Sequence, residues 1–245
     1  MRTIKLTLGY DGTDFRGWQV QPGLPTIQAE MLRALEHVTG EPVNIEVSGR
    51  TDSGVHAIGQ AASFTTNSAI PGANLVKAVN RWLPRAIRVY AAEEREPGFH
   101  ARFSAIAKTY RYRLYRGPIC PPERWRYVHH FPYPLELPEM HAASAEFEGT
   151  HDFTSFTSPL ELPSGSRERL IHHSRLTEGD GELAYEVRGS GFLHHMVRNM
   201  IGTLIEVGKG NLRAPDIARI IDAKDRQVAG PSAPSKGLWL VGVEY

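Results

Sequence analysis

Residues 43–65, VNIEVSGRTDSGVHAIGQAASFT, hold two strand-like patterns around a short turn. Apolar and polar residues alternate from Val43 to Ser48, which is the pattern of a half-buried strand. A second strand-like run follows from Ala57 to Thr65. Between them, Asp52-Ser53-Gly54 favours a turn because aspartate bonds to nearby backbone groups and glycine tolerates positive φ. The sequence therefore predicts a loop between two strands, with Asp52 on it.

The segments on both sides of this stretch predict a β-α-β-β-α-β order, which is the order of a ferredoxin-like unit. Each predicted helix is followed by a stop signal, Gly40 after the first and Pro84 after the second. The predicted elements are a strand at Thr3–Tyr10, a helix at Thr26–Thr39, the two strands around Asp52, a helix at Gly72–Trp82 and a strand at Ile87–Ala92.

The second half of the chain repeats this order. Its predicted elements are strands at Lys108–Arg116, Arg169–Leu176, Leu183–Gly189 and Leu238–Tyr245, and helices at Pro138–Phe147, Phe192–Val207 and Ala214–Ala223. We therefore expect a mixed α/β (α+β) fold of two ferredoxin-like halves, residues 1–105 and 106–245, joined near Glu93–Ala107.

Three long segments lack the periodicity of regular elements. They are Gly9–Pro25, Arg116–Leu135 and Ser155–Glu168. Long irregular segments within a compact chain are more often functional than slack, so we expect them to be functional loops.

The composition is that of an ordinary soluble globular protein, with 41% hydrophobic and 22% charged residues in a chain of 245. A single cysteine, Cys120, excludes an intramolecular disulfide framework and a cysteine-rich zinc site. The N-terminus has no signal-peptide pattern, and no apolar run approaches the roughly 20 residues of a membrane span. These features predict a cytoplasmic protein with no membrane association.

The net charge of +1 does not by itself indicate a nucleic-acid partner, but the charges are unevenly distributed. Residues 102–127 contain seven basic residues and one acid, Glu123, interleaved with tyrosines and Trp125. Residues 67–88 contain four basic residues and no acid. This composition fits an RNA-facing groove, in which cations meet phosphates and rings stack on bases. It fits equally a solvated strand face with arginines outside and tyrosines packed inside.

The histidine pairs do not indicate a metal site. They are His129-His130, His172-His173 and His194-His195. Adjacent residues on one element do not converge on an ion, and no Cys or His partner pattern accompanies them. Gly208-Lys209-Gly210 lacks the Ser or Thr and the glycine spacing of a phosphate loop. We therefore expect neither a metal nor a cofactor.

Residues 48–60 resemble the active-site motif of the tRNA pseudouridine synthase A family. The resemblance extends along nearly the whole chain, because four further motifs similar to those of the family follow the family's order. They lie at residues 10–21, 99–112, 149–156 and 192–202.

This resemblance implies that the sheets of the two halves merge into one antiparallel platform flanked by helices. It also implies a cofactor-independent isomerase that acts on uridines 38, 39 and 40 in the anticodon stem-loop of tRNA, as a homodimer. Asp52 matches the family's essential aspartate and is the expected nucleophile. The sequence leaves open whether it attacks C1′ of the ribose or C6 of the base.

Three further residues are candidates for substrate binding: Arg50, Tyr110 and Arg198. Arg50 precedes Asp52 by two residues, so both would point to one face of an extended segment, and the family implies that Arg50 contacts the RNA. Arg198 lies in an apolar helix pattern, and a buried arginine needs a partner. The resemblance implies that this partner is Asp52; the alternative is a structural ion pair with another acid. Tyr110 matches the tyrosine that stacks on the flipped base. Whether it also moves a proton, or packs in the core with Tyr112, stays open.

Two other functions are compatible with parts of the sequence. One is a non-catalytic tandem ferredoxin-like RNA-binding protein, which the presence of Asp52, Tyr110 and Arg198 together argues against. The other is a hydrolase that cleaves a glycosidic bond. Glycosidases usually employ two carboxylates, and the segment around Asp52 offers one.

Overall fold

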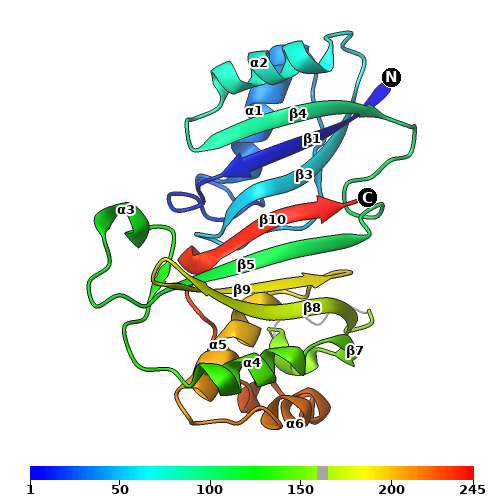
Figure 1. Ribbon diagram of the computed structural model, residues 1–245. Coiled ribbons are helices and arrows are strands. Elements are labelled where there is room, and N and C mark those ends of the chain that lie inside the picture. The colour runs from blue at the N-terminus through cyan, green and yellow to red at the C-terminus, as the bar shows by residue number, and fades with distance from the viewer. Residues whose placement is uncertain (159–164) are drawn as a thin grey trace. The chain divides into compact units, whose positions relative to one another are not determined.

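The computed structural model describes residues 1–158 and 165–245. The chain divides into two compact units (Figure 1). Unit 1 comprises Met1–Ile106 with Trp239–Tyr245, and unit 2 comprises Ala107–Leu238.

Unit 1 contains the elements β1 (Arg2–Tyr10), α1 (Ile27–Thr39), β2 (Glu46–Val47), β3 (His56–Thr66), α2 (Gly72–Trp82) and β4 (Ile87–Arg95). Strands β4, β1 and β3 lie side by side in that order, with β2 also on β3, and all these pairs are antiparallel. This is the predicted β-α-β-β-α-β order. The first strand of the central pair is much shorter than predicted, since Glu46–Val47 alone form a ladder with β3.

The C-terminal strand β10 (Leu238–Glu244) differs from its predicted place. The sequence order put residues 238–245 in the second half, whereas residues 239–245 belong to unit 1. The reason is a parallel ladder in which Trp239 pairs with His56 and Leu240 with Ala57 of β3. A pairing between residues so far apart in sequence leaves no mark in the local hydrophobic pattern.

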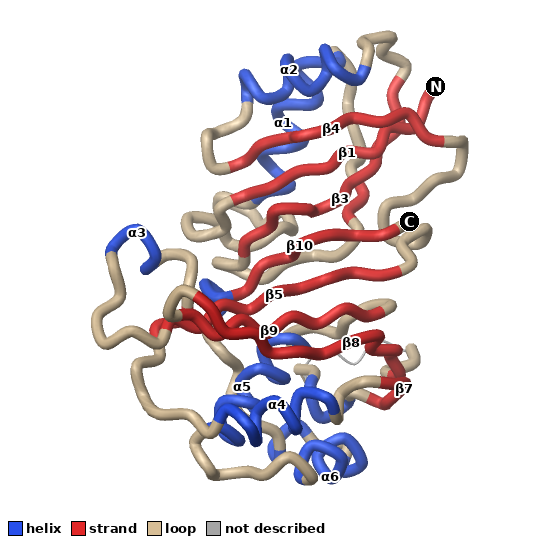
Figure 2. The backbone as a smooth tube through the Cα atoms, viewed as in Figure 1, coloured by secondary structure: helices blue, strands red, loops and turns tan. Residues whose placement is uncertain are grey.

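The core of unit 1 lies between the strands and the two helices. Ile4, Leu6 and Leu8 of β1 are fully buried, and their neighbours Lys5 and Thr7 point to the other face. Helix α1, which passes behind the strands (Figure 2), buries one face made of Ile27, Met31, Ala34 and Leu35. The apolar face of the strand and the apolar face of the helix therefore form one buried layer.

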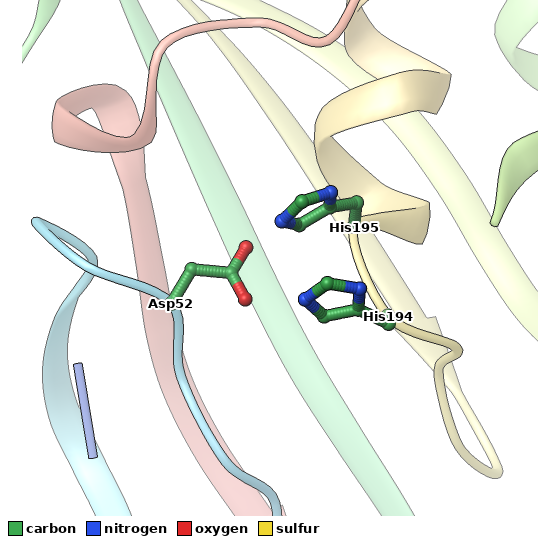
Figure 3. A group of neighbouring side chains, drawn as sticks. All are labelled: Asp52, His194 and His195. Atoms are coloured by element: carbon green, nitrogen blue, oxygen red, sulfur yellow. The ribbon is translucent and has the colours of Figure 1, made fainter. Parts of the chain in front are cut away.

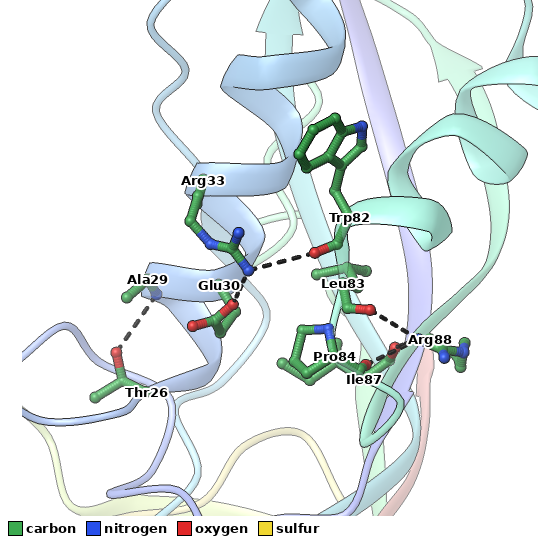
Figure 4. A network of polar contacts seen from close by, with 9 residues as sticks. All are labelled: Thr26, Ala29, Glu30, Arg33, Trp82, Leu83, Pro84, Ile87 and Arg88. Atoms are coloured by element: carbon green, nitrogen blue, oxygen red, sulfur yellow. Dashed lines mark hydrogen bonds and ion pairs between the residues drawn. The ribbon is translucent and has the colours of Figure 1, made fainter.

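Helix α1 carries the predicted stop signal at one end and a side-chain cap at the other. Thr26 is the N-cap residue, and its side chain accepts a hydrogen bond of 3.4 Å from the N–H of Ala29 (Figure 4). Gly40 ends the helix at φ 74°, and its N–H donates to the carbonyl of Glu36. These caps explain why the sequence predicts the limits of this helix well.

Arg33 of α1 and Arg88 of β4 donate hydrogen bonds to the end of α2 and the turn after it. Arg33 contacts Glu30 and donates to the carbonyl of Trp82 over 3.3 Å, and Arg88 donates to the carbonyls of Pro84 and Ile87 over 2.8 and 2.6 Å (Figure 4). The C-terminal carbonyls of α2 and its turn therefore have donors from outside the helix.

Unit 2 is built on the antiparallel strand order β5-β9-β8-β7. These strands span Ala107–Tyr115 (β5), Glu182–Gly189 (β9), Glu168–Gly179 (β8) and Gly149–Asp152 (β7), and the helices are α3 (Pro122–Trp125), α4 (Leu137–Ala145), α5 (Met196–Gly208) and α6 (Asp216–Ala223). A two-residue strand, β6 (His129–His130), adds to β5 in parallel. Short 3₁₀ turns occur at Thr154–Phe156, Arg226–Val228 and Ser235–Gly237.

Two predictions for unit 2 need correction. Helix α5 begins at Met196 rather than Phe192, because His195 has φ 60° and the helix can only start after it. The segment Arg116–Leu135, predicted as irregular, contains α3 and β6. Of the third predicted loop, Ser155–Glu168, residues 159–164 lie outside the described residues.

The predicted fold class is confirmed: the protein is a mixed α/β protein with a large, mostly antiparallel sheet flanked by helices. Within residues 1–158 and 165–245, no helix combines the length and the apolar character that a membrane crossing requires.

The N-cap of α1 gives a test of this fold. Thr26→Ala removes the oxygen that accepts from Ala29, so we expect the free energy of unfolding to fall by about 1 kcal/mol. Urea denaturation followed by circular dichroism measures this change. Thr26→Ser keeps the capping oxygen, so its free energy of unfolding should fall clearly less. Equal losses in both variants would contradict the capping role.

Candidate functional site

Asp52 lies on a tight turn between β2 and β3, as predicted. Its carbonyl accepts a hydrogen bond of 3.1 Å from the N–H of Val55, and Gly54 has φ 76°. A positive φ at the third residue is the signature of a type II turn, which explains the glycine. Asp52 is half-buried and Ser53 is exposed. The carboxylate is thus carried by a closed turn directly before a long strand.

The loop after β1 holds this turn on both sides of Asp52. Trp18 donates its N–H to the carbonyl of Thr51 over 3.0 Å. On the other side, the carbonyl of Phe15 accepts from the N–H of Gly54 and from the hydroxyl of Ser53, both at 3.3 Å. The backbone next to Asp52 is therefore bonded before and after the residue.

Helix α1 holds that loop in turn. The N–H groups of Ile27 and Gln28, in the first turn of the helix, donate to the carbonyls of Gly17 and Trp18 over 3.1 and 2.9 Å. In most helices the first N–H groups bond to a capping side chain or to water, whereas here they bond to the loop. The position of Asp52 therefore depends on helix α1 through two layers of backbone hydrogen bonds.

Gly17 makes a close backbone contact between the loop and the turn. It has φ +86°, and a Cβ atom there would lie 2.7 Å from the carbonyl oxygen of Thr51 and 3.1 Å from the carbonyl carbon of Asp52. A side chain would collide with the turn at this position, and residues other than glycine rarely adopt this backbone conformation. Glycine is the residue that allows the two segments to pack.

A buried polar network lies beneath the turn. The hydroxyls of Tyr10 and Thr51 are 2.8 Å apart, and Gln60 donates to the Tyr10 oxygen over 3.2 Å and to the carbonyl of Gly49 over 3.0 Å. Ser48 donates to the Gln60 carbonyl oxygen over 2.7 Å. Burial raises the pKa of Tyr10 to about 12, so the phenol stays neutral.

The sequence analysis missed Ser48 and Gln60 as positioning residues. Gln60 lies opposite Leu8 in the β1–β3 ladder, so its side chain is on the apolar face of β3. A polar residue at a position where the strand pattern requires an apolar one is the signal that could have identified it.

Arg50 and Asp52 lie on either side of Thr51, which is buried, whereas Arg50 is exposed. This alternation is compatible with the prediction that Arg50 and Asp52 share a face. Their roles toward a substrate remain predictions.

Tyr110 and Tyr112 both lie on β5 of unit 2. Tyr110 is 7% exposed, and its ring meets that of Phe192 edge-on with 5.0 Å between centroids. Tyr112 is fully buried and donates its hydroxyl to the carbonyl of Pro234 over 2.8 Å. Burial raises the pKa of Tyr112, and the nearby charge of Arg198 acts in the opposite direction. Tyr112 is therefore a core residue.

Arg198 lies in the first turn of α5 and is half-buried rather than fully buried. Its Nε donates to the carbonyl of Ala233 over 2.8 Å, and the N–H of Ala233 donates to the carbonyl of Arg198 over 3.0 Å. This reciprocal pair fixes the plane of the guanidinium. The predicted pairing of Arg198 with Asp52, a residue of unit 1, remains a prediction.

Two residues that the sequence analysis gave no role hold the segment that contacts Arg198. A Cβ atom at Gly202 would lie 1.7 Å from the carbonyl oxygen of Pro231, so this segment packs directly on the helix backbone. Asn199 is buried, donates to the carbonyl of Phe156 over 2.7 Å and accepts from Arg226 over 3.1 Å. Their position in the same motif as Arg198 was the available signal.

The residues before α5 adopt a strained conformation. His195 has φ 60° and ψ 0°, which is the left-handed region that few residues other than glycine adopt. Its ring stacks on that of His194 with 3.7 Å between centroids. Figure 3 draws this histidine pair before α5 and, in unit 1, the Asp52 side chain on its turn. Strain of this kind is concentrated at functional sites.

The basic stretch of unit 2 is largely paired with acids. Arg111 contacts Glu186 over 2.8 Å, and Arg113 and Arg124 contact Glu182 over 2.7 and 3.2 Å. Since Arg111 and Arg113 are on β5 and both acids are on β9, these are cross-strand pairs. For these arginines the structure supports a solvated strand face rather than an RNA-facing groove.

The model of the family described as "tRNA pseudouridine synthase" matches residues 8–104 and 143–245. The chain belongs to this family. The match includes the Asp52 turn, the loop that holds it and helix α5, and it confirms the resemblance found in the sequence. Tyr110 lies outside the matched residues.

Curated relatives of this family are similar over the full length of the chain. The chain is 49% identical to tRNA pseudouridine synthase A of Solibacter usitatus and 42% identical to that of Acetivibrio thermocellus, covering 100% of both proteins in each comparison. It is 43% identical to the enzyme of the same name from a Geobacillus species, covering 98% of that protein.

Gly17→Ala tests whether the contact between the loop and the turn sets the activity of this family member. The new methyl group would push against the Thr51 carbonyl, so we expect Asp52 to shift and kcat for pseudouridine formation to fall by about tenfold or more. Steady-state kinetics with tRNA measures kcat.

Gly23→Ala is the matched control. Gly23 has φ +70°, similar to Gly17, but a Cβ atom there meets no heavy atom within 4 Å. Both variants should lose comparable stability from backbone strain, about 1 kcal/mol, while Gly23→Ala keeps native kcat. If both lowered kcat alike, strain and not the contact would be responsible.

Proposed function

We propose that this chain converts uridine to pseudouridine at positions 38, 39 and 40 in the anticodon stem-loop of tRNA, as an intramolecular transferase without a cofactor. The full-length similarity to enzymes named tRNA pseudouridine synthase A carries this proposal. The fixed turn that bears Asp52 supports it, because a nucleophile needs a defined position.

The reaction is an isomerisation in which the bond between ribose C1′ and uracil N1 breaks and a bond between C1′ and C5 forms. N1 gains a proton and C5 loses one, so the equation balances without a co-reactant. Asp52 acts as the nucleophile, either at C1′ or at C6, and is released when the new carbon–carbon bond has formed. Both points of attack are compatible with a carboxylate on an immobile turn.

Arg50, Tyr110 and Arg198 are the proposed substrate-binding residues. Extrusion of a uridine from its stack costs a few kcal/mol, and stacking on an aromatic ring such as that of Tyr110 returns about 1–3 kcal/mol. The exposed position of Arg50 suits a contact to the RNA backbone. The Nε–Ala233 bond of Arg198 supports a positioning role, since it orients the guanidinium.

Asp52→Asn tests the chemistry directly. The amide keeps the size of the side chain but is a poor nucleophile, so we expect turnover to fall by at least about 10³-fold while the Kd for tRNA stays within about threefold of native. Release of label from tRNA carrying tritium at uracil C5 measures turnover. Asp222→Asn, an exposed carboxylate on α6, is the control and should retain native turnover.

The same assay separates the alternatives. Isomerisation releases the C5 label and leaves the base attached, hydrolysis yields free uracil, and binding alone does neither. Free uracil would establish a hydrolase. Native turnover by Asp52→Asn would remove Asp52 from the mechanism.

We propose in addition that the enzyme is a cytoplasmic homodimer, in which the two subunits share the surface that binds one tRNA. The family resemblance is the support for this assembly. Sedimentation should give twice the chain mass of 27.3 kDa at the concentrations used for the assay. A monomer with full activity would contradict it.

A further inference from the structure

The loop between β5 and β6 presents an aromatic residue to solvent in a fixed position. Residues 116–128 leave the sheet after Tyr115 and return at His129-His130, and helix α3 lies within this loop (Figure 2). Tyr115 pairs with His130 in the parallel β5–β6 ladder, and the carbonyl of Tyr115 accepts from Phe131 over 2.8 Å. The loop is therefore closed at its base.

The loop is also attached to the β8–β9 hairpin. Arg116 donates its backbone N–H to the carbonyl of Gly181 over 2.9 Å. Arg124 donates to the carbonyl of Asp180 over 3.1 Å, contacts Glu182 and lies over the Tyr115 ring. A loop held at its base and along its side presents its remaining side chains with little conformational freedom.

Trp125, at the end of α3, is the aromatic residue so presented. It is 53% exposed, and the ammonium of Lys236 lies 3.6 Å from its ring centroid. Lys236 is brought there by the Ser235–Gly237 turn, which packs on the Tyr112 ring at Gly237. Among the residues that the structure describes, no carboxylate lies within ion-pair distance of Lys236, unlike Arg113 and Arg124.

A buried imidazole nitrogen of β6 has no hydrogen-bond partner among the described residues. The buried Nδ1 of His129 makes no hydrogen bond to any residue in the described part of the chain. The His129 ring meets the Tyr112 ring edge-on with 6.1 Å between centroids, and Gly237, next to Lys236, packs on the same tyrosine ring. The site thus combines an exposed ring, a cation without a carboxylate and an unsatisfied imidazole nitrogen.

We propose that Trp125 and Lys236 form an RNA-binding subsite, in which the indole stacks on a nucleotide and the ammonium contacts a phosphate, in addition to the substrate-binding residues proposed above. An aromatic ring next to a cation that no carboxylate neutralises is a combination that binds single-stranded or looped RNA. The exposed ring favours RNA over an acidic peptide, because a nucleotide offers a base to stack as well as a phosphate. The cation beside the ring disfavours the apolar surface of a second copy, which would have to bury that charge. The assignment to tRNA rests on the proposed function.

Trp125→Ala and Lys236→Ala test the subsite with full-length tRNA. We expect Trp125→Ala to raise the Kd and KM for tRNA by about tenfold with kcat unchanged, and Trp125→Phe to restore most of the affinity. Lys236→Ala should lower the slope of log Kd against log salt concentration by roughly 0.7 to 0.9, and Lys236→Arg should keep the native slope.

Two variants serve as matched controls. Tyr90→Ala removes an aromatic ring that is 57% exposed in unit 1, and Lys209→Ala removes a lysine whose partner is Glu206 on α5. Both should keep the native KM and salt slope. The thermal unfolding midpoint of every variant is measured in parallel. If Trp125→Ala does not fold, the salt slopes of Lys236→Ala and Lys236→Arg test the subsite.

Native KM and native salt slope in the folded Trp125 and Lys236 variants would overturn the proposal. So would a change in sedimentation with unchanged tRNA affinity, which would assign the surface to a second copy of the chain. If the native protein does not release the C5 label, the proposed function is contradicted. The Kd values of the native and variant proteins for tRNA would in that case still show whether Trp125 and Lys236 bind RNA.

Discussion

The hydrogen bonds on both sides of Asp52 are the constraint on which the rest of unit 1 depends. Trp18 donates to the carbonyl of the residue before the aspartate, and the carbonyl of Phe15 accepts from Ser53 and Gly54 after it. These bonds fix the backbone position from which the Asp52 side chain extends. A carboxylate that must reach one atom of a nucleotide gains most of its advantage from such positioning. Strand β1, helix α1 and the loop between them can be understood as the support of one turn.

This support explains residues that have no chemistry of their own. Gly17 allows backbone to pack against backbone, and Tyr10, Ser48 and Gln60 satisfy one another beneath the turn. A buried polar group without a partner costs about 1–3 kcal/mol, so the network resists the loss of any one member. The position of the turn is therefore specified by hydrogen bonds between polar groups in the core.

Unit 2 follows the same principle with a different element. Helix α5 approaches the Ala229–Ala233 segment closely at Gly202, and this contact brings the Ala233 carbonyl to Arg198. Its first turn follows His195, whose backbone lies in the left-handed region. The orientation of a charged side chain is again set by backbone contacts that lie several residues away.

The sequence by itself determined the order of the elements from β1 to β4, the limits of α1 and α2, and Asp52 on a turn between strands, because these depend on local periodicity, caps and turn residues. Only the tertiary structure decided that β10 pairs with β3, that β6 closes the loop bearing Trp125, and that Gln60 lies beneath the turn. These features join residues far apart in the chain. Their energy comes from hydrogen bonds and packing between segments, which no local pattern encodes.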